Sequence, residues 1–107
     1  MSDDTMWPND VDGDVFRNLQ ENGFDFSKEY VVDFNVDFES WPPAVDLSAD
    51  MKKAFPGAVV ERIDDDEYIV VKIKTRLTYE FVVFAQKKLS DIAQIHGGYC
   101  ESWGVMH

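Results

Sequence analysis

The sequence predicts an α+β fold: a ferredoxin-like βαββαβ sandwich, in which helices cover one face of a four-stranded antiparallel sheet, preceded by an extra N-terminal helix. Three observations support this: alternating segments typical of half-buried strands, amphipathic segments with capping residues, and the order in which they follow one another. A chain of 107 residues with 45% hydrophobic residues is sufficient for one core. We therefore expect a single domain over residues 12–107 and an acidic flexible arm over residues 1–11.

The first helix is expected to begin near Asp14. Its apolar residues fall on one stripe, which consists of Val15, Phe16 and Leu19. Asp12 or Asp14 is available as the N-cap, and Gly23 can take the left-handed conformation that ends a helix. The residues before this helix are polar and acidic, with Met6 and Trp7 as their only sizeable apolar side chains. This composition places them in the arm.

The segment "EYVVDFNVDFE" alternates strictly between apolar and polar residues, which indicates a strand with one buried face. Asp33, Asn35 and Asp37 share its polar face. The prolines of "SWPP" end the strand, and "DLSADMKKAFPG" is typical of a short second helix. The inward residues of that helix are spaced by four: Leu47, Met51 and Phe55.

The segments "AVVERI" and "EYIVVKIKTRL" are predicted to form a hairpin around an acidic turn, Asp64 to Glu67, although this turn lacks a glycine. The second of these strands alternates, so its basic side chains share one face. We expect those side chains to lie beside Asp33, Asn35 and Asp37 and to form cross-strand pairs with them, because opposite charges on neighbouring strands attract. The basic side chains are Lys72, Lys74 and Arg76.

The last helix is expected to start after Thr78, whose hydroxyl can cap it, while Leu77 packs on Val82 as a hydrophobic staple. Gly97 and Gly98 end it. Its predicted inward stripe consists of Phe81, Ala85, Leu89, Ile92 and His96. The predicted core contains Phe34, Val36, Val71, Ile73, Phe81, Leu89 and Ile92.

The final segment, "YCESWGVM", is predicted to be a short strand that completes the sheet. Strict alternation places Tyr99, Glu101 and Trp103 on one face. Because a carboxylate is expected to point away from the helices, this arrangement exposes an indole and a phenol on the open face, where large apolar groups often mark a partner site. In the alternative, the strand is shifted and Trp103 belongs to the core.

The net charge is −11, and most acidic residues precede Tyr68. This charge disfavours direct binding to nucleic acids, which requires clustered lysine and arginine, and it favours a basic protein partner. The alternative is that the acidity only keeps the protein soluble. The single cysteine, Cys100, and the absence of a signal peptide or a long apolar run predict a cytoplasmic protein without a membrane span.

No constellation in the sequence indicates catalysis, a cofactor or a metal site. The acidic run "DVDGDVFRNLQE" has carboxylates at several positions of a calcium loop, but Val15 stands where that loop needs glycine. His96 and Cys100 supply only half of a structural zinc site. Cys100 has no evident base that would activate it as a nucleophile. We therefore predict a non-enzyme that needs no cofactor.

The segments "DGDVFRNLQENGFDFSKEYVVDF", "AFPGAVVERIDDDEYIVVKIK" and "HGGYCESWG" resemble the RraB family, the regulators of ribonuclease activity that inhibit ribonuclease E. The resemblance covers roughly residues 12–105. In this family a Gly-Gly pair precedes Tyr-Asp-Gly-Trp-Gly or a close variant. Residues Cys100 to Gly104 match the acid, the tryptophan and the last glycine of that motif, but not its tyrosine and middle glycine.

The resemblance implies a non-catalytic protein that binds ribonuclease E rather than RNA. Together with the net charge of −11 it predicts a basic segment of that enzyme as the partner. We expect the protein to be a monomer or weak dimer. The alternatives are another interaction module, such as an immunity protein against a basic toxin, or a sensor of small ligands. The residues expected to bind the partner are Tyr99, Glu101, Trp103, Asp33 and Asp37.

Overall fold

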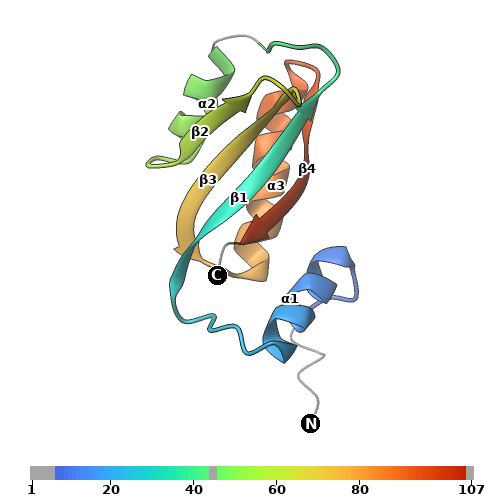
Figure 1. Ribbon diagram of the computed structural model, residues 1–107, viewed down its shortest axis with the longest axis vertical. Coiled ribbons are helices and arrows are strands. Elements are labelled where there is room, and N and C mark those ends of the chain that lie inside the picture. The colour runs from blue at the N-terminus through green and yellow to red at the C-terminus, as the bar shows by residue number, and fades with distance from the viewer. Residues whose placement is uncertain (1–6, 44–45, 106–107) are drawn as a thin grey trace.

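The computed structural model describes residues 7–43 and 46–105 of the chain. In chain order its elements are α1 (Val11–Glu21), β1 (Glu29–Phe38), α2 (Asp46–Ala54), β2 (Val59–Ile63), β3 (Tyr68–Arg76), α3 (Tyr79–Gln94) and β4 (Gly98–Val105) (Figure 1). Among the described residues, no helix is long and apolar enough to cross a membrane. The predicted mixed α+β composition is confirmed.

The four strands form one antiparallel sheet in the order β2-β3-β1-β4, as predicted for the sheet. β1 lies in the interior of the sheet because it pairs with β3 on one side and with β4 on the other. Helices α2 and α3 cover one face of the sheet, and α1 lies beyond one end of it (Figure 1). We call the opposite face the open face. Along β1 it presents Val31, Asp33, Asn35 and Asp37.

The core lies between the sheet and helices α2 and α3. The predicted alternation of β1 is confirmed, because three side chains on one face are completely buried: Val32, Phe34 and Val36. Both helices add buried side chains, which are Leu47 and Met51 from α2, and Val82, Ala85, Leu89 and Ala93 from α3. Burial of this apolar surface is the main favourable contribution to folding.

The predicted inward stripe of α3 is only partly correct. Leu77 and Val82 are both buried, as expected for a staple, and the buried stripe of the helix runs through Val82 rather than Phe81. Phe81 and Ile92 therefore lie beside the stripe and are only partly buried. Four other predicted core residues, Phe34, Val36, Val71 and Leu89, are completely buried, whereas Ile73 is partly buried. The helix ends before His96.

The capping residue of α1 differs from the prediction. Asp10, not Asp12 or Asp14, is the N-cap, and its carboxylate accepts a 2.7 Å hydrogen bond from the backbone N–H of Gly13. The same carboxylate accepts a 2.5 Å bond from the hydroxyl of Tyr79 on α3. This second bond is a tertiary contact, which explains why local sequence alone did not select Asp10.

Two of the other predicted helix signals, Thr78 and Gly23, are confirmed. Thr78 caps α3, and its hydroxyl accepts a 3.1 Å bond from the N–H of Phe81. Gly23 follows α1 with a φ of +79°, a conformation that side chains with a Cβ rarely adopt. In the turn between β2 and β3, Glu67 takes a φ of +57°, the conformation that a glycine would take more readily. The hairpin forms without that glycine.

Helix α1 is joined to the rest of the molecule by aromatic rings that we call the aromatic seam: Trp7, Phe16, Phe26, Tyr79 and Trp103. The completely buried Phe16 lies at its centre, and its ring centroid lies 5.5 Å from that of Trp7 and 5.6 Å from that of Trp103. Trp7, which the sequence assigned to the arm, is therefore packed against the domain. Met6 and the residues before it lie outside the described residues.

Candidate protein-binding site

A β-bulge in β4 determines which of the predicted site residues share a face. Asn35 of β1 pairs with Ser102, but the next residue, Val36, pairs with Cys100. Glu101 is therefore an extra residue without a partner on β1, and alternation is reversed across it. Tyr99 before the bulge lies opposite Asp37 on the open face. The strict alternation predicted for this strand is wrong.

Trp103 lies on the helix side of the sheet, not on the open face. It pairs with the completely buried Phe34, and its indole Nε1 donates a 2.8 Å hydrogen bond to the carboxylate of Asp12 on α1. The ring also packs on Phe16. The expectation that Trp103 is an exposed partner residue is wrong, and the alternative that it packs with the core is correct. Its indole connects β4 to α1.

Three other predicted residues, Tyr99, Glu101 and Asp37, come together at one end of the open face. Asp37, Glu101 and Tyr68 line a shallow hollow of about 220 Å³. A neighbouring hollow of about 360 Å³ is lined by Asp37 and Tyr99 together with three further acidic residues. We call this region the acidic end, and it consists of Asp37, Glu39, Asp66, Glu67, Tyr68, Tyr99 and Glu101.

The carboxyl groups of Asp37 and Glu101 interact directly. A hydrogen bond to Asp37, followed by the repulsion of its negative charge, raises the pKa of Glu101. A negative charge beside a carboxyl group disfavours its ionised form. A lysine or arginine side chain brought against the pair would offset the repulsion between the two groups. Clustered carboxylates of this kind can attract a cationic side chain.

The expected row of ion pairs along the open face is wrong. Of the three predicted β1 residues, only Asp33 lies opposite a basic residue, Lys72, and the Lys72 ammonium instead contacts the Glu61 carboxylate on β2 at 3.1 Å. Outside the predicted set, Glu29 lies opposite Arg76. Within the part of the chain that the structure describes, Asp33 Oδ1 is buried without a hydrogen-bond partner. The register places the remaining basic side chains, Lys74 and Arg76, near the opposite end of the sheet from Asp37. The acidic end therefore keeps its charge uncompensated by this row.

Sequence reasoning missed some residues of the acidic end. Tyr68 pairs with Asp37 in the ladder between β1 and β3, so it shares the open face with Lys72 by simple alternation. That pattern was visible in the sequence. In contrast, Asp66 and Glu67 were assigned to a solvated turn, and only the folded sheet shows that this turn borders Tyr99. No pattern in the amino-acid sequence indicated the bulge at Glu101.

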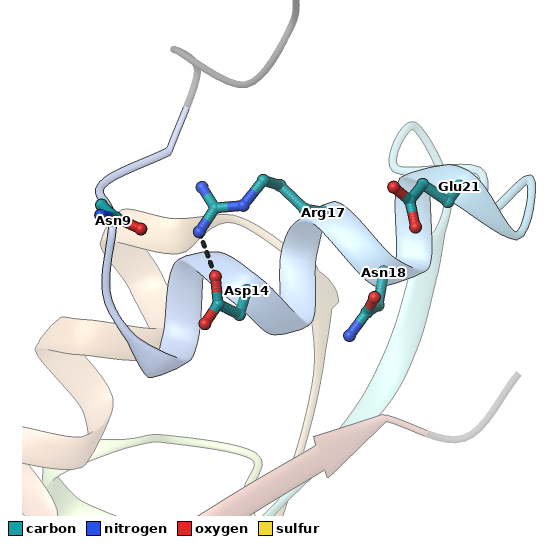
Figure 2. Close-up of a pocket in the computed structure, with 5 residues that line it drawn as sticks. All are labelled: Asn9, Asp14, Arg17, Asn18 and Glu21. Carbon is teal, nitrogen blue, oxygen red and sulfur yellow. Dashed lines mark hydrogen bonds and ion pairs between the residues drawn. The ribbon is translucent and has the colours of Figure 1, made fainter.

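A second charged region lies on the outer surface of α1, where Asn9, Asp14, Arg17, Asn18 and Glu21 line a shallow hollow (Figure 2). The Arg17 guanidinium is already engaged there. It forms an ion pair with Asp14 and donates hydrogen bonds to the backbone carbonyls of Trp7 at 3.2 Å and Pro8 at 3.3 Å. These contacts hold the segment before α1 against the helix, so this hollow has a structural explanation.

Cys100 is placed unfavourably for nucleophilic chemistry. It lies on the helix side of β4, opposite the buried Val36, and its backbone N–H donates a 2.9 Å bond to the hydroxyl of Ser90 on α3. Burial is the main cause that raises the pKa of its thiol to about 12. The thiolate, which is the reactive form, is therefore scarce near neutral pH. Among the described residues no three His, Cys, Asp or Glu side chains are grouped to hold a metal.

Comparison with protein families gives a match over residues 9–105 to RraB, described as regulator of ribonuclease activity B. The matched region contains all three helices and all four strands of the described chain. It also includes every residue assigned above to the acidic end and most of the aromatic seam. Comparison with individually curated proteins finds no match.

Proposed function

Because the chain belongs to the RraB family of regulators of ribonuclease activity, we propose that it binds a basic segment of ribonuclease E and inhibits or redirects that enzyme. In this proposal the protein does no chemistry itself, binds no nucleic acid directly and acts in the cytoplasm as a monomer or weak dimer. The family match is the observation that carries the proposal. The geometry of the open face indicates where the partner would bind.

The acidic end is the binding surface we propose. Its carboxylates are clustered around Asp37 and Glu101, which repel one another in the free protein. A basic segment would relieve this repulsion, so electrostatic free energy favours the complex. Tyr99 is 52% exposed and supplies a ring with both apolar surface and a hydroxyl, a residue type enriched in binding hot spots.

The charge of the whole chain supports the same partner. A net charge of −11 attracts a basic segment over distances comparable with the Debye length, about 8 Å at physiological ionic strength. This attraction mainly raises the association rate, whereas close contacts such as those of Tyr99 determine the dissociation rate. Binding should therefore weaken as salt concentration rises. Asp33 lies on the same face and would extend the surface toward the middle of the sheet.

The strand order β2-β3-β1-β4 and the element order after α1 support the ferredoxin-like assignment. In that arrangement α1 is an addition at the N-terminus, and the open face remains uncovered by the helices of the repeat. Such a sheet face is suited to a protein partner, because it presents a broad surface with side chains at regular spacing.

The proposal is tested by measuring the affinity of purified ribonuclease E for the chain and for a double variant, Asp37→Asn with Glu101→Gln. We expect the double variant to bind about tenfold more weakly, because it removes both carboxylates without changing side-chain shape. A matched control, Asp50→Asn with Glu21→Gln, alters net charge equally at distant exposed positions. The control should retain most of the affinity.

Two results would contradict the proposal. If the unmodified chain does not bind ribonuclease E at micromolar concentration and low salt, the partner is wrong. If the control pair weakens binding as much as the double variant does, only net charge matters and the acidic end is not the site.

A further inference from the structure

A second pocket lies between α1 and the first turn of α3, at the aromatic seam. It has a volume of about 300 Å³, and its lining includes Trp7, Phe16, Phe26, Tyr79, Gln20 and Glu80. Pockets that hold small organic ligands range from about 300 to 1,000 Å³. The volume is therefore at the lower limit for a cofactor, but it is ample for one long side chain.

Aromatic rings form the walls of this pocket. Trp7 and Phe26 are partly buried, and their ring centroids lie 5.7 Å apart. The completely buried Phe16 contacts both of them, at 5.5 Å from Trp7 and 5.9 Å from Phe26, and Tyr79 of α3 lies 6.1 Å from Phe16. An aromatic ring carries partial negative charge on its faces and attracts a cation placed within about 6 Å. Several rings around one space reinforce this attraction.

Polar contacts behind the walls hold the rings in position. The carbonyl of Trp7 accepts a bond from Arg17, whose guanidinium also pairs with Asp14 (Figure 2). On the other side, the hydroxyl of Tyr79 donates to the carboxylate of Asp10 at 2.5 Å. Because these groups are already held in the free protein, a ligand would lose little affinity to ordering them.

The pocket has a negative rim. Glu80 lines it and is exposed, and none of its lining residues is a lysine or arginine. The hydrogen bond to Asp10 and burial, followed by the negative charges of Asp10, Asp12 and Glu80, raise the pKa of Tyr79 to about 12. The carboxylate of Asp10, bonded to Tyr79, and that of Glu80, in the lining, place negative charge on the α3 side of the pocket. A basic side chain would fill the space and also place its charged group near the Glu80 carboxylate, whereas an apolar side chain would gain nothing from that charge.

We propose that this pocket binds the side chain of an arginine in a basic segment of the protein partner. The aromatic rings would contact the faces of the planar guanidinium, and Glu80 would pair with its N–H groups. Arginine fits this combination better than lysine does, because its guanidinium both stacks on rings and donates several hydrogen bonds. The inference rests on the proposed function, since it supplies a second contact, beyond the acidic end, for the same kind of partner.

The pocket can be tested without the partner, by titrating N-acetyl-arginine methylamide into the full chain and following the tryptophan indole N–H signals by NMR. We expect a saturable shift at Trp7 and none at Trp41, whose ring already lies 5.7 Å from the guanidinium of Arg62 and serves as an internal control. The citrulline analogue has the same shape without charge and should bind at least fivefold more weakly. Glu80→Gln should weaken arginine binding at least threefold, and Glu21→Gln should not.

The outcomes distinguish a failure of the arginine pocket from a failure of the proposed function. Absence of a saturable shift at Trp7, or equal binding of the citrulline analogue, overturns the arginine pocket whatever the partner is. If ribonuclease E binds the unmodified chain and Glu80→Gln leaves that affinity unchanged, the pocket is not used by this partner and the inference fails. If the arginine probe binds as expected but ribonuclease E does not, the proposed function fails while the arginine specificity of the pocket is supported.

Discussion

The two ends of the molecule use the same residue type in opposite ways. At the aromatic seam the carboxylates are engaged: Asp10 accepts hydrogen bonds from Gly13 and Tyr79, and Asp12 accepts one from Trp103. At the acidic end, Asp37 and Glu101 interact with each other, the contact is partly repulsive, and neither forms an ion pair with a basic side chain among the described residues. Carboxylates with donors stabilise the fold, whereas carboxylates without them are available to a partner. The comparison predicts that substitutions at the two ends will have opposite consequences.

The largest difference in stability is expected between alanine variants of the two large aromatic residues of β4, Trp103 and Tyr99. Trp103→Ala should destabilise the protein by about 3 to 5 kcal/mol, because it removes a ring packed on Phe16 and leaves a cavity. Tyr99→Ala should change the free energy of unfolding by less than about 1 kcal/mol, since its ring is largely exposed. Denaturant titration of both variants measures this. Equal losses would show that the bulge does not separate the two residues.

The order of these two variants should be reversed when partner affinity is measured, with the larger loss at Tyr99. Tyr99→Ala is expected to weaken partner affinity while its melting temperature stays close to that of the unmodified chain. Trp103→Ala should be compared at a temperature well below its own melting transition. A folded Trp103→Ala variant that binds less tightly than Tyr99→Ala would contradict the assignment of the acidic end as the surface.

A smaller effect is expected when carboxylates are compared. Asp12→Ala should cost about 1 to 3 kcal/mol of stability, because the Trp103 indole N–H loses its acceptor and Gln86 loses a partner. Asp37→Asn should cause no loss, since it removes a negative charge beside Glu101. Thermal unfolding near neutral pH provides the test. A clear loss of stability in Asp37→Asn would mean that the acidic end also supports the fold.

The smallest expected effect is the pH dependence of stability that arises from Glu101. Its pKa is raised in the folded state, so the folded protein keeps a proton that the unfolded chain has already lost. Stability is therefore reduced as pH rises from the usual glutamate pKa of 4.5 through the raised value. Glu101→Gln should be more stable than the unmodified chain at neutral pH and equal to it at acidic pH. Denaturation midpoints of the two proteins at both pH values provide the measurement. A Glu101→Gln variant that is less stable than the unmodified chain at neutral pH would contradict the prediction.

Much of the fold was predictable because it follows from local patterns. The alternation of β1 reflects the two faces of a strand, and it identified Val32, Phe34 and Val36 as inward residues. Thr78 and Gly23 act within a few residues of themselves, so their effects could be recognised without tertiary contacts. The capping residue of α1 was missed because Asp10 also bonds to Tyr79, which lies far away in the sequence.

The candidate site was predictable only in part. The acidic character and the approximate position of Asp37 and Tyr99 followed from charge and alternation. The position of Trp103 did not, because one extra residue in β4 reverses the faces on either side of it. Glu101 was placed on the open face by counting from Tyr99, whereas Trp103 required knowledge of how β4 pairs with β1.

The sequence by itself determined the secondary structure, the inward face of the central strand and the negative charge, since these depend on residue type and short-range spacing. Only the tertiary structure decided the register of β4. There Val36 pairs with Cys100, the Cys100 N–H bonds to Ser90, and Trp103 pairs with Phe34 on β1 and packs on Phe16. These contacts join segments far apart in the chain, and together they favour a bulge at Glu101 over a regular strand. The bulge turns Trp103 toward the core and leaves Tyr99 on the open face, because side chains on a strand alternate.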